Sequence, residues 1–142
     1  MNILYSIFLF ILDISIFISS KFNEKNRKIF EGRKNSFQYI LDNNITEEKI
    51  IWIHVSSVGE FEQAKPIIER IKLNYQYKVL VTYFSSSAEL IVSEHKEVDY
   101  HFFLPSDRKK HMEKLFSLLN PKIIVLIKYE FWKNLIDLAY YN

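Results

Sequence analysis

The stretch IIWIHVSSVGE, residues 50–60, decides the fold of this chain. Residues 50–55 are almost wholly apolar on consecutive positions and rich in Ile and Val, a pattern typical of a strand that is covered on both faces. A small polar turn with Gly59 follows, and a helical spacing of apolar residues begins at Phe61. The stretch therefore predicts a strand, a turn and a helix, the repeating unit of a parallel α/β sheet.

Further short apolar runs alternate with helical patterns along the rest of the chain. The runs are residues 79–84, 100–104 and 123–127. The helical patterns are residues 61–73, 87–95 and 108–119. Because crossovers between parallel strands are right-handed, this alternation predicts an open α/β sheet of Rossmann type.

Residues that begin and end helices flank these patterns. The serines at 85–87 can supply a cap for the second helix. Ser106 or Asp107 can cap the third helix, and Asn120 can end it. Pro66 lies inside the first helical pattern, where its ring and its missing N–H disfavour a continuous helix. We therefore expect the first helix to kink at Pro66 or to begin close to it.

Residues 3–18, ILYSIFLFILDISIFI, predict a membrane-seeking helix. No positive leader and no small-residue cleavage site precede Ser20, so we expect this helix to remain in the mature protein. A span takes ~20 apolar residues, and Asp13 inside a shorter run makes a half-inserted anchor as consistent as a span. A buried core helix is the alternative. We assign residues 1–20 to a membrane-anchor helix.

Residues 21–48 are rich in Lys, Asn and Glu and predict a basic connector with a short amphipathic piece at residues 37–41. The basic residues follow the apolar segment directly, as on the cytoplasmic side of a membrane helix, where each contributes ~1 kcal/mol near anionic lipid. A solvated linker is the alternative. We expect the α/β domain to occupy residues 49–142.

Composition excludes several classes of function. A net charge of +2, with basic and acidic residues interspersed, argues against a nucleic-acid partner. Two glycines are too few for a glycine-rich phosphate loop, and without cysteine there is no thiol nucleophile. The four histidines are scattered singly, so we expect neither a metal nor a cofactor. Among them, His54 reads as an ordinary polar residue at a strand end.

Ligands of open parallel sheets bind beyond the carboxyl ends of the strands, so the turn after the first run carries candidate site residues. Ser56, Ser57, Gly59 and Glu60 occupy this turn, and Glu60 stands where a helix begins. The helix dipole favours an ionised carboxylate there, which suits a proton acceptor. The alternative is that Glu60 is only a charge at a helix start.

The segment KYEFWKN follows the last apolar run and mixes a carboxylate with large aromatic side chains. A simple turn would prefer Gly, Asn or Pro, so Glu130, Trp132 and Asn134 suggest a pocket wall. The alternative is that Tyr129, Phe131 and Trp132 pack the sheet edge against a helix while Glu130 is solvated.

Four motifs in this order resemble those of the 3-deoxy-D-manno-octulosonic acid (Kdo) transferases of lipopolysaccharide synthesis. They are HVSSVGE at 54–60, TYFSSSA at 82–88, LPSD at 104–107 and KYEFWKN at 128–134. The resemblance covers essentially the whole chain, including the apolar helix and the basic stretch. It implies the GT-B architecture of two Rossmann-like domains across a cleft, with this chain as the N-terminal, acceptor-side half.

The resemblance also implies roles for particular residues. Glu60 matches the general base that deprotonates the acceptor hydroxyl while Kdo is transferred with inversion from CMP-Kdo to lipid IVA, the lipid A precursor. Glu130 matches a second functionally important acidic position. The remaining motif residues are expected to bind substrate; they are Ser56, Ser57, Gly59, Ser85, Ser86, Trp132 and Asn134.

The chain departs from the family pattern at Ala88, Lys128 and Lys133, where many members have Gly, Glu and Pro. Both key carboxylates are intact. A whole enzyme would continue beyond Asn142 into a domain that binds CMP-Kdo, so we expect a fragment or split gene product that is inactive alone, on the cytoplasmic face of the inner membrane. The alternatives are a non-catalytic, membrane-tethered α/β binding module and another peripheral GT-B glycosyltransferase.

Overall fold

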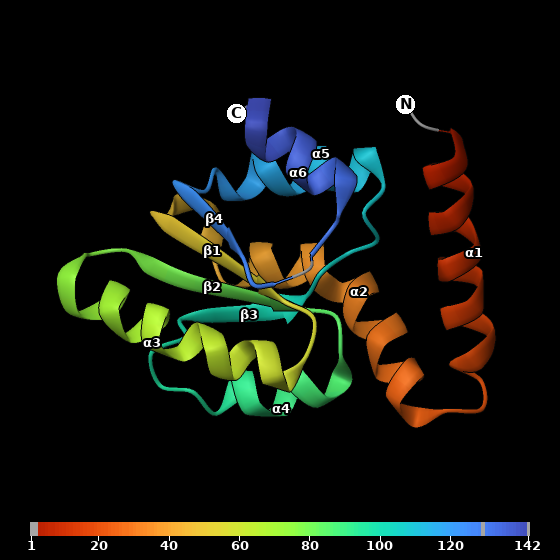
Figure 1. Cartoon of the computed structure of the whole chain (residues 1–142), viewed down its shortest axis with the longest axis horizontal. Coiled ribbons are helices and arrows are strands. Elements are labelled where there is room, and N and C mark those ends of the chain that lie inside the picture. Colours follow the sequence, from red (N-terminus) through yellow and green to blue (C-terminus); the bar gives the residue numbers. More distant parts are fainter. Residues whose placement is uncertain (1–2, 129, 142) are drawn as a thin grey trace.

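The computed structural model describes residues 3–128 and 130–141, and it shows a parallel sheet between layers of helices (Figure 1). The strands are β1 (Ile50–Val55), β2 (Lys78–Tyr83), β3 (Tyr100–Phe103) and β4 (Ile123–Leu126). The helices are α1 (Ile3–Ser19), α2 (Glu24–Asp42), α3 (Val58–Asn74), α4 (Ser86–Ser93), α5 (Lys109–Leu119) and α6 (Lys133–Tyr141), with a short 3₁₀ helix η1 (Ile45–Glu47). The strand order is β3-β2-β1-β4, as in the first four strands of a Rossmann sheet. The predicted α/β class with a parallel sheet is confirmed.

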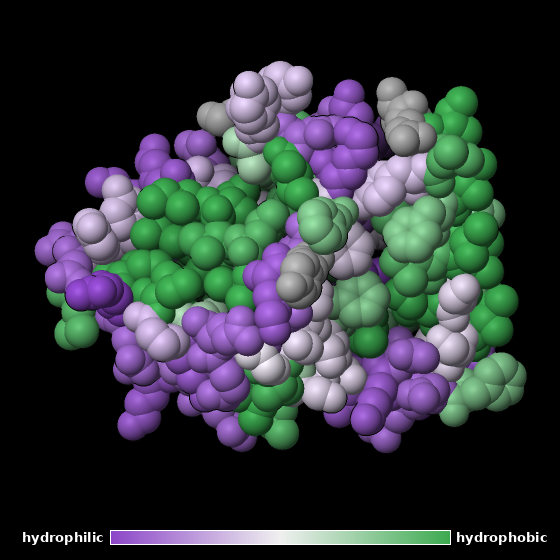
Figure 2. Space-filling view, viewed as in Figure 1, coloured by the Kyte–Doolittle hydropathy of each residue, from purple (hydrophilic) through white to green (hydrophobic). Residues whose placement is uncertain are grey.

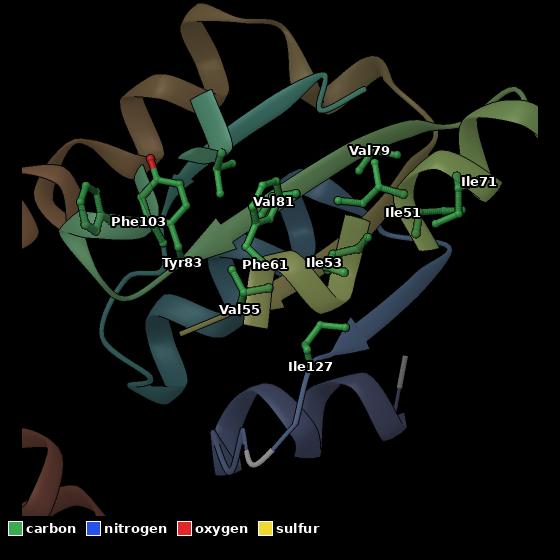
Figure 3. Close-up of a cluster of buried hydrophobic side chains, with 14 of the residues drawn as sticks. Ile51, Ile53, Val55, Phe61, Ile71, Val79, Val81, Tyr83, Phe103 and Ile127 are labelled. Atoms are coloured by element: carbon green, nitrogen blue, oxygen red, sulfur yellow. The ribbon is translucent and has the colours of Figure 1, made fainter. Parts of the chain in front are cut away.

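Strand β1 separates two apolar cores because its side chains alternate between the faces of the sheet. Ile51, Ile53 and Val55 belong to the core that includes α3 and α4, part of which Figure 3 shows. Ile50 and Trp52 belong to the core beneath α5 and α6. All six residues of β1 are buried, which explains why the run is apolar without alternation.

Helix α3 continues through Pro66 rather than beginning at it. Its start is fixed further upstream, because Glu60 accepts the amide of Ser57 as the carboxylate half of a capping box. Phe61 and Ile68 are fully buried on either side of Pro66. Burial of such side chains contributes roughly 1.5–3 kcal/mol each, which together offsets the ~3 kcal/mol that a proline inside a helix costs.

Helix α2 occupies most of the segment expected to connect the apolar helix to the domain. The expectation of only a short amphipathic piece was wrong, because apolar residues at helical spacing are spread among the Lys and Asn residues. Ile29 contacts one core and Ile40 the other, so α2 crosses the edge of the sheet at β3. Ser36 donates a hydrogen bond of 2.6 Å to the carbonyl of Phe103. The division of the chain into three parts stays a prediction.

Helix α1 rests on the domain through one side only. Leu9 and Ile16 are buried, and Asp13 accepts hydrogen bonds of 2.9 Å each from Ser106 and Arg108. The carboxylate that seemed costly in a membrane helix therefore has partners in the loop after β3. The outward side is apolar and forms the green column at the right of Figure 2; its exposed residues are Ile3, Leu4, Ile7, Phe8, Phe10, Ile11, Ile14, Phe17 and Ile18.

Across residues 3–128 and 130–141, no helix has the length and apolarity needed to cross a membrane.

We predict that Gly32→Ala destabilises the protein. A Cβ at this position would lie 2.9 Å from Cγ of buried Phe103, inside the contact distance of the ring. Overpacking of this kind costs ~1–3 kcal/mol and outweighs the ~1 kcal/mol that Ala gains over Gly in a helix. Urea unfolding measures the difference. Gly59→Ala is the matched control, because its Cβ would meet nothing within 4 Å; equal unfolding midpoints for the two variants would contradict the prediction.

Candidate active site

The turn between β1 and α3 holds Glu60 through one of its carboxylate oxygens. Oε2 accepts hydrogen bonds from the amides of Ser56 (2.6 Å) and Ser57 (2.9 Å). Within the described residues, the other oxygen makes no hydrogen bond. Gly59 is exposed and Glu60 is half-buried. The carboxylate is thus fixed in position while Oε1 is left available to a ligand.

Glu130 follows β4 and is only 7% exposed. The interpretation of Glu130 as a solvated charge was therefore wrong. Trp132, which is half-buried, donates a hydrogen bond of 2.6 Å from its indole nitrogen to Oε2 of Glu130. Phe131 is 77% exposed and does not pack against the sheet edge. Tyr129, the remaining aromatic residue of the segment, lies outside the described residues.

The buried carboxylate of Glu130 stays ionised because of its partners. Burial alone raises its pKa, since a charge is costly away from water. The neighbouring His54, Ser56 and Trp132 side chains favour the charged form and outweigh burial, so the pKa of Glu130 lies below its ordinary value. Glu130 is thus a carboxylate, and an acceptor of hydrogen bonds, at neutral pH.

Ser56 lies between the two candidate carboxylates. Its amide donates to Glu60, and its side chain is among the neighbours that lower the pKa of Glu130. Its carbonyl accepts the amide of Ser85 at 3.0 Å, which brings the turn after β2 to the same place. The turns after three parallel strands therefore meet around Ser56, at the edge of the sheet where ligands bind in this fold.

The two serines after β2 border this site. Ser85 caps α4, because its hydroxyl accepts the amide of Ser87 at 3.1 Å, and the predicted cap is confirmed. Ser86 is the first residue of α4 and is half-buried. Their predicted role in substrate binding stays a prediction.

Asn134 is held by a different part of the protein. Its amide and that of Leu135 donate to the carboxylate of Asp107, each at 2.9 Å. The sequence suggested Asp107 as a cap for α5. Asp107 caps α6 instead, because α6 presents its N-terminal amides to the loop after β3. Tyr5 donates to the same carboxylate at 2.6 Å. Burial raises the pKa of Asp107, although these hydrogen bonds oppose the shift.

The sequence interpretation missed a series of buried, hydrogen-bonded polar side chains behind the site. His54 is fully buried in β1 and lies beside Thr82 of β2, its register partner. The indole of Trp52 donates to the hydroxyl of Thr82 at 2.7 Å. A histidine inside an otherwise apolar strand was the available signal, because a buried imidazole needs partners.

A hollow of about 400 Å³ lies between α1, α2 and the loop after β3. Its basic side chains are Arg33, Lys34 and Arg108, with Asp13 as the single acid among the lining residues. Phe30 and Phe37 are among its apolar walls. The hollow thus combines positive charge with an apolar surface.

Arg33 connects this hollow to the active-site edge. Its guanidinium lies 4.5 Å from the ring centre of Phe84, and Phe84 stacks on Trp132 at 5.8 Å. Burial lowers the pKa of Arg33 to about 10, although Asp13 opposes the shift. In the described part of the chain, Nε of Arg33 has no hydrogen-bond partner.

The site offers the chemistry of carboxylates, hydroxyls and an indole. Among the described residues, no three His, Cys, Asp or Glu side chains are placed to hold a metal ion. Two carboxylates bracket Ser56, one with an unbonded oxygen and one buried and ionised. This arrangement suits removal of a proton from a bound hydroxyl.

A sequence model of the family described as 3-deoxy-D-manno-octulosonic-acid transferase (kdotransferase) matches residues 25–141. Among curated proteins, the 3-deoxy-D-manno-octulosonic acid transferase of Aquifex aeolicus is 32% identical over 87 residues, which cover 61% of this chain and 24% of that protein. The enzyme of the same name from Haemophilus influenzae is 26% identical over 88 residues, or 61% of this chain and 21% of that protein.

A bifunctional glycosyltransferase/methyltransferase of Fusobacterium nucleatum is 26% identical over 128 residues, which cover 87% of this chain and 19% of that protein. The chain therefore spans about a quarter of the length of these curated relatives, or less.

We predict that Glu130→Gln removes a pH-dependent contribution to stability. Because the pKa of Glu130 is lowered on folding, its contribution is present above the unfolded-state pKa of ~4.3 and is lost as the pH falls through the lower folded-state pKa. The free energy of unfolding of the parent should exceed that of the variant by ~1–3 kcal/mol at pH 7, and this difference should disappear in acid. Urea unfolding from pH 7 to pH 3 measures it. Exposed Glu31→Gln is the control, and a gap that is constant with pH would contradict the assignment.

Proposed function

Because the chain belongs to the 3-deoxy-D-manno-octulosonic acid (Kdo) transferase family of glycosyltransferases, we propose that it carries the acceptor side of an enzyme that transfers Kdo from CMP-Kdo to lipid IVA. The transfer inverts the configuration of the Kdo anomeric carbon and releases CMP. The chain spans about a quarter of the length of these relatives, and we propose that binding of CMP-Kdo needs a second domain. The chain alone is then inactive.

The observation that carries this proposal is the meeting of Glu60 and Glu130 at Ser56. Glu60 acts as the general base and accepts the proton of the acceptor hydroxyl through Oε1. Its Oε2 is held by the backbone, so the reacting oxygen has a defined position. Glu130 is the second carboxylate near Ser56 and is ionised at neutral pH. Ser57, Ser85, Ser86 and Asn134 take supporting roles in acceptor binding.

The acceptor proposal is supported by the hollow beside α1. Lipid IVA carries phosphate groups on an acylated sugar, so its binding site needs positive charge next to an apolar surface. Arg33, Lys34 and Arg108 supply the charge, and Phe30 and Phe37 supply apolar walls. Arg33 also contacts Phe84, which stacks on Trp132 of the site.

We place the protein on the cytoplasmic face of the inner membrane. Support comes from the exposed apolar side of α1, where Leu4 is 76% and Ile11 57% exposed. Exposed apolar surface of this extent marks an interaction site, and acyl chains would cover it. The basic residues of α2 follow directly and favour anionic lipid.

A non-catalytic binding module is the second candidate, and one observation favours it. Glu60 already has a structural task as the carboxylate of a capping box. A glutamate with this task alone would leave transfer unaffected when its charge is removed.

We predict that Glu60→Gln lowers Kdo transfer by roughly 10²–10⁴-fold, because the variant cannot take the proton. Gln retains an oxygen that can accept the amide of Ser57, so the thermal midpoint should change little. The assay supplies the donor domain by fusion and measures transfer to lipid IVA together with thermal unfolding. Glu62→Gln, an exposed change on the same helix, is the control. Full activity of Glu60→Gln would remove Glu60 from the mechanism, whereas a parent fusion without transfer would support the binding module.

We also predict that α1 binds membranes through its exposed stripe. Ser in place of Leu4, Ile11 and Ile18 should lower binding to phosphatidylglycerol/phosphatidylethanolamine vesicles by about tenfold or more, since each buried Leu or Ile contributes roughly 1.5–3 kcal/mol. Co-sedimentation measures binding. Leu73→Ser, at an 84% exposed position on α3, is the control. Equal binding of the triple variant and the parent would exclude α1 as the anchor.

A further inference from the structure

His54 is the one histidine of the described chain that is fully buried. It lies in β1, an inner strand of the sheet that helices cover on both faces. Water cannot reach it there, so its two ring nitrogens need partners in the protein. Nδ1 lies 3.0 Å from the carbonyl oxygen of Thr82 and 2.9 Å from its hydroxyl. Nε2 lies 2.9 Å from the indole nitrogen of Trp132.

These partners define the neutral form of the ring. An indole N–H only donates, so Nε2 of His54 accepts from Trp132. The hydrogen of the neutral imidazole is then on Nδ1, where the carbonyl of Thr82 can only accept. Thr82 is fixed in turn, because its hydroxyl accepts from Trp52. The imidazole is therefore oriented from inside the sheet.

The indole N–H of Trp132 lies between two acceptors. It is 2.9 Å from Nε2 of His54 and 2.6 Å from Oε2 of Glu130, and those two atoms are 3.5 Å apart. The indole stacks on Phe84, with 5.8 Å between the ring centres and 15° between the rings. His54 therefore sets the direction of the N–H, and the N–H sets the place of the Glu130 carboxylate.

We infer that His54 is a positioning residue for the active site, which acts through Trp132 and Glu130 on the turn that carries Glu60. Glu130 lies close enough to the side chain of Ser56 for that residue to lower its pKa, and the amide of Ser56 donates to Glu60, so the three residues are neighbours. This inference rests on the proposed function for its effect on transfer. Its structural part can be tested in the chain alone.

Two conservative substitutions separate the two ends of the imidazole. His54→Gln can place its amide oxygen near the position of Nε2 and still accept from Trp132. His54→Asn is shorter and can keep only the contact with Thr82. If His54 only fills the core, the two variants should have equal activity, or their losses of activity should follow the decrease in their thermal midpoints.

Indole N–H signals report the contact directly, because the chain has two tryptophans and each gives one ¹H–¹⁵N cross-peak. In His54→Asn the signal of Trp132 should move, because its N–H loses one of its two acceptors, whereas the signal of Trp52 should stay in place. In His54→Gln both signals should remain near their parent positions. Trp132→Phe assigns the peaks.

In the fused, complete enzyme, His54→Asn should lower transfer about tenfold or more, within the range of positioning effects, and His54→Gln should restore most of the activity. Trp132→Phe, which keeps the stack on Phe84 but lacks the N–H, gives the same loss and serves if His54→Asn does not fold. An unmoved Trp132 signal in folded His54→Asn, or equal activity of the Asn and Gln variants, overturns the inference. Absence of transfer by the parent fusion overturns the proposed function instead and leaves the indole result standing.

Discussion

Strand β1 is buried along its whole length between two layers of helices, and the site depends on this constraint. A polar side chain in such a strand is tolerated only where protein groups bond to it. His54 meets this requirement by bonding to Thr82 of the neighbouring strand and to the indole of Trp132. Trp132 also donates to Glu130. The hydrogen-bonding requirement of buried His54 therefore holds the segment after β4 against β1.

Local structure and chemistry share residues at the site. Glu60 begins α3 by accepting backbone amides, and the same bonds hold its carboxylate still. A general base needs a defined position, so a capping role and a catalytic role are compatible. Asp107 is the contrasting case. Both of its oxygens are bonded, to Tyr5 and to the first turn of α6, and its role is structural.

The two N-terminal helices both contact the α/β domain. Helix α2 passes from one core to the other around the β3 edge, which requires close contact between Gly32 and Phe103. Helix α1 is joined to the loop after β3 by Asp13, its one charged residue. An apolar helix with its polar group facing the protein leaves a continuous apolar surface facing outward (Figure 2).

The sequence by itself determined the strands, three of the helices that cover them and the turns that carry the site, because these follow from local periodicity and from turn residues such as Ser85. It also placed Glu60 at a helix start. Only the tertiary structure decided which groups meet: that Asp107 caps α6, that Asp13 bonds to the loop after β3, and that His54 reaches Glu130 through Trp132. A local pattern reports whether a residue is buried or helical. The identity of a distant partner depends on how elements pack, and no local pattern encodes that.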